Sequence, residues 1–165
     1  MNSYQELYTK GLKLLALRAH SEEELAEKLA RTGSAEDVAR VLADFKAINL
    51  INDLDFARAY ALYKLQNRPV ARARAALDLR KKKVRKPVIE RALDEVYANV
   101  DEAALADQLI ARWLARWGKP EDVKAVKRLA GFLQRQGFPS DLLYDKLSPY
   151  FSALESSSRR AKDTE

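Results

Sequence analysis

Few residues of this sequence have the types and spacing that could support metal or acid–base chemistry. Two acidic pairs carry the oxygen ligands that divalent cations prefer, Asp53 with Asp55 and Asp101 with Glu102. Both pairs stand where helices are expected to begin, and stabilisation of a helix dipole is the interpretation we favour. His20 is the single histidine and cysteine is absent, so no second ligand of that kind could share a zinc ion. Because nucleotide-binding glycine loops and hydrolase motifs are also missing, we expect no catalytic residue, no metal, no cofactor and no enzymatic activity.

Clustered positive charge is the clearest chemical signal in the chain. The net charge is +6, yet residues 64–91 alone hold eleven bases and only two acids. Such a cluster concentrates a positive potential and suits the phosphate backbone of a nucleic acid. A solvated basic face is the alternative interpretation. The residues of this stretch that we predict to contact a polyanion are Arg72, Arg74, Arg80, Lys81, Lys82, Lys83, Arg85 and Lys86.

A second basic stretch covers residues 112–135, and it adds three predicted contacts, Lys124, Lys127 and Arg128. Two tryptophans stand at its beginning. Trp113 and Trp117 are four positions apart and therefore share one face of a helix. We expect this pair to anchor its helix against neighbouring helices, with one ring partly exposed as a partner contact.

The elements that must position these residues are expected to be helices. Alanine and leucine contribute 26 and 24 residues, whereas glycine and proline contribute five each, which disfavours a fold of many short strands. Ser21 with Glu24, and later Ser34, are typical of helix starts. The apolar spacing predicts nine helices, near residues 4–19, 22–32, 35–48, 53–67, 70–83, 87–98, 101–117, 120–136 and 140–151.

The predicted helices form a repeat of three. Leu29, Leu79 and Leu133 occupy equivalent positions in successive units. Units of ~50 residues are marginally stable alone, so neighbouring units should pack on one another. We expect an all-α protein of three tandem three-helix repeats in an elongated, curved helical stack. The expected domains are residues 1–51, residues 52–99 (the basic repeat), residues 100–151, and a flexible polar tail over 152–165.

Three segments resemble the RecX family, bacterial regulators of the RecA recombinase. They are LRAHSEEELAEKLARTG (17–33), VARVLADFKAINLINDLDFARAYA (38–61) and RLAGFLQRQGFPSDLLYDKL (128–147). The matched positions are Ser21, Glu24, Leu25, Lys28, Leu29, Gly33, Leu50, Asp53, Phe56, Ala57, Phe132, Leu133, Arg135, Gly137, Phe138 and Asp141.

The chain departs from the family at the turn before its middle basic helix. Gln66-Asn67-Arg68-Pro69 replaces the usual Gly-Tyr-Gly-Pro, and Lys83 replaces the glycine that usually follows the basic run.

The resemblance implies a non-enzymatic regulator that acts on RecA. It implies binding in the groove of a filament of RecA on single-stranded DNA, with inhibition of filament growth, ATPase and strand exchange, and so modulation of recombination and DNA repair. The basic residues above would then face the filament or its DNA. We expect a monomer without cofactors. Because the N-terminus lacks the apolar core of a signal peptide and no apolar run reaches the ~20 residues of a membrane span, we expect a cytoplasmic protein without membrane contact.

Two other functions remain open from the residues alone. The chain could be an autonomous DNA-binding protein with helix-turn-helix-like units that acts without RecA. It could also be a helical scaffold that meets only proteins. Sequence-specific binding to duplex DNA would favour the first of these, and strong effects on RecA with weak DNA binding would favour the RecX interpretation.

Overall fold

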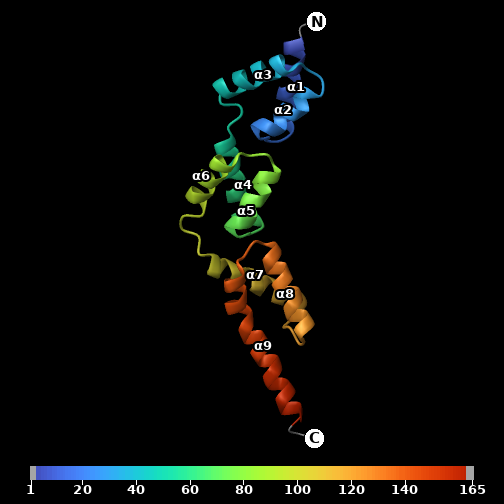
Figure 1. The fold of residues 1–165 in the computed structure, drawn as a ribbon, viewed down its shortest axis with the longest axis vertical. Coiled ribbons are helices and arrows are strands. Elements are labelled where there is room, and N and C mark those ends of the chain that lie inside the picture. Colours follow the sequence, from blue (N-terminus) through green and yellow to red (C-terminus); the bar gives the residue numbers. More distant parts are fainter. Residues whose placement is uncertain (1–2, 163–165) are drawn as a thin grey trace. The chain divides into compact units, whose positions relative to one another are not determined.

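The structure, a computed structural model, describes residues 3–162, and helices account for most of that range (Figure 1). The described residues contain no strand, so the expected all-α class is confirmed for this part of the chain. None of the helices in it is long and apolar enough to cross a bilayer. The helices are α1 (Ser3–Leu17), α2 (Glu22–Ala30), α3 (Ala35–Ala47), α4 (Asp53–Asn67), α5 (Arg72–Lys81), α6 (Lys86–Val96), α7 (Glu102–Trp117), α8 (Val123–Arg135) and α9 (Ser140–Lys162).

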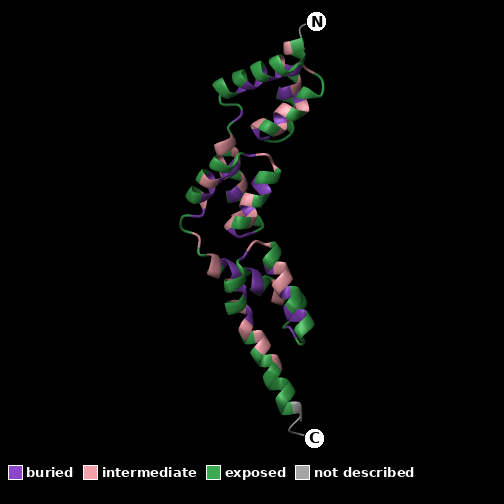
Figure 2. Ribbon diagram, in the orientation of Figure 1, coloured by how far each residue is buried: buried purple, intermediate pink, exposed green. Residues whose placement is uncertain are grey.

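The helix bounds agree with the predicted ranges within a few residues, except at the last helix. The prediction ended that helix near residue 151 and treated 152–165 as a tail; this end is wrong, because α9 continues to Lys162. Pro149 lies inside α9 and cannot donate to the carbonyl of Asp145, but the Ser148 hydroxyl donates there at 3.3 Å. The last part of the helix is largely exposed (Figure 2). Residues 163–165 of the expected tail lie outside the described residues.

The described residues fall into two compact units, each with its own buried side chains. The first unit takes the described parts of Met1–Tyr63 and Ala76–Ala98. Its α1–α3 core contains Leu7, Leu25, Leu29, Val38, Val41, Leu42, Phe45 and Ile51. The second unit takes the described parts of Lys64–Ala75 and Asn99–Glu165. Its core contains Ala71, Leu105, Ala106, Leu109, Ile110, Val126, Leu129, Leu133, Phe138, Leu143 and Leu147.

The division into three repeats at residues 51 and 99 stays a prediction. Helix order and the equivalent buried positions Leu29, Leu79 and Leu133 are consistent with it. Gly33 follows α2, but its φ is not positive, so it does not serve as a left-handed glycine at the end of that helix. A Cβ at position 33 would instead meet the Leu7 side chain at 2.2 Å, so glycine is required there by the close approach of α1.

Three helices of the described chain end in the same type of turn, in which one residue has a left-handed backbone. The residues are Asn49, Lys83 and Gly137, with φ of 54°, 65° and 90°. After each, the next amide donates to the carbonyl five positions earlier, as in the Schellman motif. Lys83 therefore adopts the conformation for which glycine is favoured, and the departure from the family pattern at this position does not remove the turn.

Changing Lys83 to glycine is expected to raise the free energy of unfolding by about 1 kcal/mol, because a left-handed backbone costs a residue with a Cβ about that much. The substitution also removes the Lys83–Glu27 ion pair, which is exposed and contributes little. Urea denaturation measures the effect as a higher midpoint, while the slope of the free energy of unfolding against urea concentration stays unchanged. Asn49→Gly serves as a comparison. Its expected gain in free energy of unfolding is smaller, since asparagine tolerates the left-handed backbone. A loss of stability in the Lys83 variant would contradict the argument.

Candidate functional site

The single histidine of the chain has a structural role. His20 is buried, its Nδ1 donates to the carbonyl of Arg18 at 2.9 Å, and its Nε2 accepts from the Lys28 ammonium at 3.0 Å. Burial lowers the pKa of His20 and so favours the neutral ring that this hydrogen-bond pattern requires. His20 is therefore held by its neighbours at the start of α2, as the sequence indicated.

The acidic pairs are likewise engaged with backbone and basic groups. The Asp53 carboxylate accepts from the amide of Glu22 at 2.8 Å, so it caps the start of α2 from α4, and burial raises the pKa of Asp53. Asp55 pairs with Arg58 at 3.2 Å. Asp101 accepts two amides of the first turn of α7. Over the part of the chain that the structure describes, no group of three histidine, cysteine, aspartate or glutamate side chains could hold a metal ion.

Six of the predicted contact residues lie in the first unit, around the turn that joins α5 to α6. Two of them are partly engaged: the Lys82 ammonium lies 5.3 Å from the centroid of the Tyr60 ring, and Lys83 pairs with Glu27. The other four are exposed and make no ion pair with a carboxylate of the described residues. They are Arg80, Lys81, Arg85 and Lys86.

The backbone of this basic turn is held firmly. Val84 is buried, and its amide donates to the carbonyl of Leu79 at 3.1 Å. The hydroxyl of buried Ser21 donates to the carbonyl of Lys82 at 2.5 Å, which ties the turn to the start of α2. Pro87 lies in the first turn of α6, where its missing N–H is not needed. The four exposed cations are thus presented from an ordered turn.

The remaining five predicted residues lie in the second unit. Arg74 is half-buried, and its guanidinium donates to the carbonyl of Arg135 at the end of α8, at 2.8 Å. The amide of Arg72 donates to the Glu102 carboxylate at 2.7 Å. These contacts attach the start of α5 to α8 and α7. The exposed members of the five are Lys124, Lys127 and Arg128, all on α8.

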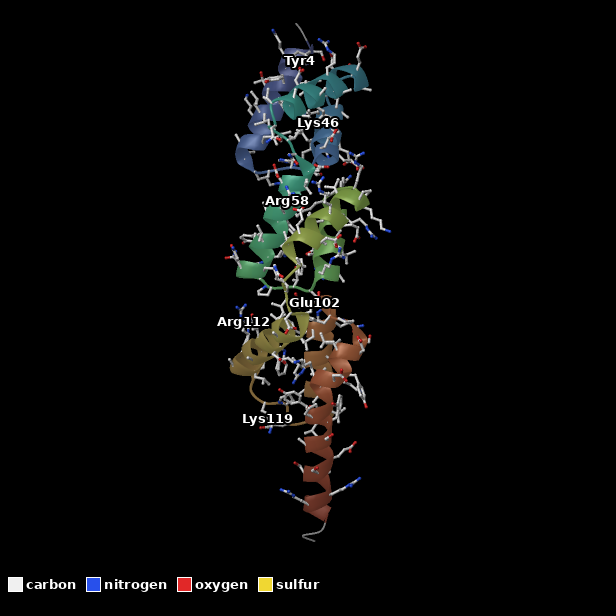
Figure 3. All side chains as sticks on the ribbon, turned by 90° about the vertical axis from the view of Figure 1, so that its left-hand side faces the viewer. Tyr4, Lys46, Arg58, Glu102, Arg112 and Lys119 are labelled. Carbon is white, nitrogen blue, oxygen red and sulfur yellow. The ribbon has the colours of Figure 1, made fainter. Side chains whose placement is uncertain are left out.

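Lys127 and Arg128 belong to a pocket of about 670 Å³ between α7 and α8, which we call the α7–α8 pocket. Its lining contains five cations, three aromatic rings and one glycine, and no carboxylate. Arg112, which lies on α7, and Lys119, on the loop after it, are labelled in Figure 3. The lining residues are Arg112, Trp113, Arg116, Trp117, Lys127, Arg128, Gly131, Phe132 and Arg135.

The cations of the α7–α8 pocket form no ion pair within the described residues, although Glu121 and Asp122 line an adjoining pocket that shares Arg128. None of the five makes an ion pair with a carboxylate among the described residues, whereas Arg18 and Arg58 of the first unit each pair with a glutamate. The Arg116 guanidinium lies 5.0 Å from the centroid of the Trp117 ring. Trp117 is 65 % exposed, so it anchors no core, and the expectation that one tryptophan of the pair is exposed is confirmed.

Sequence reasoning did not select Arg112, Arg116 or Arg135 as site residues. Their signal was the spacing of charged and aromatic residues on two successive helices: 112 with 116 and 113 with 117, each four apart, then 128 with 132 and 135, four and seven apart. That spacing places each set on one face of its own helix. Only the packing of α7 on α8 shows that the two faces line one pocket.

Comparisons with known proteins give a consistent family. A family model described as "RecX, first three-helix domain" matches residues 8–44. The chain is 39 % identical over 145 residues to a protein of Mycolicibacterium smegmatis named "Regulatory protein RecX", covering 83 % of this chain and 75 % of that one. It is 33 % identical over 145 residues to a protein of the same name from Amycolatopsis mediterranei, covering 85 % of this chain and 82 % of that one.

Solved structures give the same fold. The crystal structure of RecX from Lactobacillus salivarius matches with a TM-score of 0.72 at 17 % identity, over 93 % of this chain and 97 % of that one. A second structure, described as a regulatory protein RecX, matches with a TM-score of 0.72 at 21 % identity, over 90 % of this chain and 72 % of that one. At these identities the likeness concerns the fold alone.

Proposed function

Because this chain belongs to the RecX family of regulatory proteins, we propose that it regulates a RecA-type recombinase by binding the filament that the recombinase forms on single-stranded DNA. The bound protein, a cytoplasmic monomer, inhibits filament growth, ATPase and strand exchange, and thereby modulates recombination and DNA repair. It acts by binding, without catalysis of its own.

The observation that carries this proposal is the ordered basic turn between α5 and α6. Four exposed cations, two on each side of the turn, make no ion pair with a carboxylate of the described residues, and Arg85 lies close enough to a carboxylate, that of Asp53, to influence its pKa. A filament that contains single-stranded DNA presents a dense row of phosphates, and uncompensated cations gain most from such a partner. The turn is tied to α2 by the Ser21–Lys82 hydrogen bond, so the backbone of the turn is already ordered before binding.

The proposed contacts fall into two groups. The turn in the first unit supplies Arg80, Lys81, Lys82, Lys83, Arg85 and Lys86, and the second unit supplies Arg72, Arg74, Lys124, Lys127 and Arg128. A protein bound along the groove through such contacts obstructs the addition of subunits and the access of a second strand. We expect the cations without partners to matter most, because Lys83 and Arg74 already interact within their own units.

Changing both Arg85 and Lys86 to glutamate is expected to weaken inhibition of the DNA-dependent RecA ATPase by roughly tenfold or more, the loss that corresponds to ~1.4 kcal/mol of binding energy. The variant should stay folded, because acidic residues at the start of α6 favour its dipole. The measurement is ATPase rate on single-stranded DNA against substoichiometric amounts of this protein. Each lost contact to single-stranded phosphate should also reduce the log–log salt dependence of binding by roughly 0.7.

The matched control changes Lys13 and Arg31 to glutamate. Both are exposed in the first unit and lie outside the basic turn, so the net charge changes equally while the proposed contacts remain. We expect this control to inhibit as the parent does. If the Arg85 and Lys86 variant is folded and inhibits as well as the control, the basic turn is only a solvated face. Binding to duplex DNA with sequence preference and no effect on RecA would instead favour an autonomous DNA-binding protein.

A further inference from the structure

The α7–α8 pocket combines charge with exposed aromatic surface, which the basic turn does not. Five cations and no carboxylate line it, and two of its rings are indoles. Bringing five like charges to one pocket without acidic partners is unfavourable for the free protein, so the arrangement favours an anionic ligand. Its volume of about 670 Å³ lies in the range of pockets that hold small ligands.

Trp117 gives the pocket a stacking surface. Its ring is 65 % exposed, and the neighbouring Arg116 guanidinium lies 5.0 Å from the ring centroid. A cation at this distance interacts favourably with the electron-rich face of the indole. A large exposed aromatic ring among cations suits a ligand with a flat π-system as well as negative charge.

Gly131 keeps the pocket open. It lies inside α8, where glycine costs up to ~1 kcal/mol relative to alanine. A Cβ at this position would meet only the mobile end of the Arg135 side chain, at 3.3 Å. Packing within the protein therefore does not require glycine here. Gly131 lines the pocket without a side chain, so it leaves space there that a larger residue would fill.

We propose that the α7–α8 pocket binds an unstacked nucleotide of a single-stranded nucleic acid, with the base against Trp117 and the neighbouring phosphates on the surrounding arginines and lysine. A duplex keeps its bases stacked inside. Its phosphates can contact the cations of the pocket, but it offers no free base to the exposed ring. An acidic peptide satisfies the cations but supplies no π-face. A single strand supplies both, and base–aromatic stacking is tolerant of sequence. The pocket needs no recombinase for this contact, and its test therefore stands apart from the test of the proposed function.

The protein carries its own reporter for the pocket. It has two tryptophans, and both line the α7–α8 pocket. Titration of the full chain with a short oligothymidylate, with no RecA present, is expected to quench tryptophan fluorescence saturably. Binding is measured in parallel by the anisotropy of a labelled oligothymidylate. The matched probe is an oligonucleotide of equal length with abasic sites, which keeps the phosphates and lacks the bases.

Trp117→Ala is expected to weaken oligothymidylate binding roughly fivefold to a hundredfold, the range that corresponds to the loss of one base–aromatic stack. Trp117→Phe, which keeps a stacking ring, should restore most of the affinity. Neither variant should change binding of the abasic probe. The matched control is Tyr144→Ala, because Tyr144 is a 75 % exposed aromatic residue of the same unit outside the pocket. This control should bind both probes as the parent does.

A second variant, Gly131→Leu, fills the space that Gly131 leaves in the pocket while every cation and ring remains, and it should also weaken oligothymidylate binding. It keeps the proposal testable if Trp117→Ala does not fold. The proposal is overturned if folded Trp117 and Gly131 variants bind oligothymidylate as tightly as the parent. It is equally overturned if the parent binds the abasic probe as tightly as oligothymidylate, or if polyglutamate of equal charge displaces oligothymidylate as well as unlabelled oligothymidylate does.

Discussion

Replacing Phe45 by alanine is expected to lower the free energy of unfolding of the first unit by about 3–5 kcal/mol, the range for truncation of a fully buried phenylalanine. Phe45 is 0 % exposed, and its ring meets Tyr8 edge-on with 4.8 Å between centroids. It also fills the space against Gly11, where a Cβ would lie 2.6 Å from the ring. Removal of the ring leaves a cavity within the α1–α3 core, which cannot fully close.

Urea denaturation followed by far-UV circular dichroism measures this loss. The control is Ile48→Ala, three positions further along, where the side chain is 62 % exposed. That change should stay within about 0.5 kcal/mol, as is usual for surface substitutions. Equal effects at positions 45 and 48 would show that the α1–α3 core is not packed as described.

Changing Gly137 to alanine is expected to cost about 2–4 kcal/mol, because two separate penalties coincide. The residue has φ of 90°, which favours glycine. In addition, a Cβ would lie 2.7 Å from the backbone nitrogen of Arg74, and backbone atoms cannot move aside as a side-chain end can. The amide of Ala71 donates to the carbonyl of Gln136 at 2.9 Å, so this approach of the two segments is a fixed part of the second unit.

Gly131→Ala is the paired comparison in the same unit. It places the same methyl group inside a regular helix against one flexible side chain, so stability should be unchanged or rise by up to ~1 kcal/mol. Thermal melts of the two variants under identical conditions should give a melting temperature below the parent's for Gly137→Ala and one equal to or above it for Gly131→Ala. If Gly137→Ala melts with the parent, neither the left-handed turn nor the close approach is required.

Local signals explain why the helices could be predicted. Ser21 and Ser34 cap α2 and α3 through their own hydroxyls, as their positions indicated. The apolar residues Leu25 and Leu29, and later Leu129 and Leu133, are buried as their spacing predicted. The end of α9 was missed because serines are weak helix formers in isolation. In the structure α9 nevertheless continues through Ser156 and Ser157, whose hydroxyls donate to carbonyls four residues earlier, a bond that does not itself favour the helix.

The sequence by itself determined the helical class, most helix bounds, the family resemblance and the excess of positive charge, because each depends on neighbours along the chain. Tertiary structure alone decided what each charged or polar side chain does. Packing brings the Ser21 hydroxyl to the carbonyl of Lys82 and the Asp53 carboxylate to the amide of Glu22. It engages Lys83 with Glu27 while it leaves the pocket cations without an ion pair among the described residues. Residues far apart in the chain meet only when helices pack, and no local pattern records which helix faces will meet.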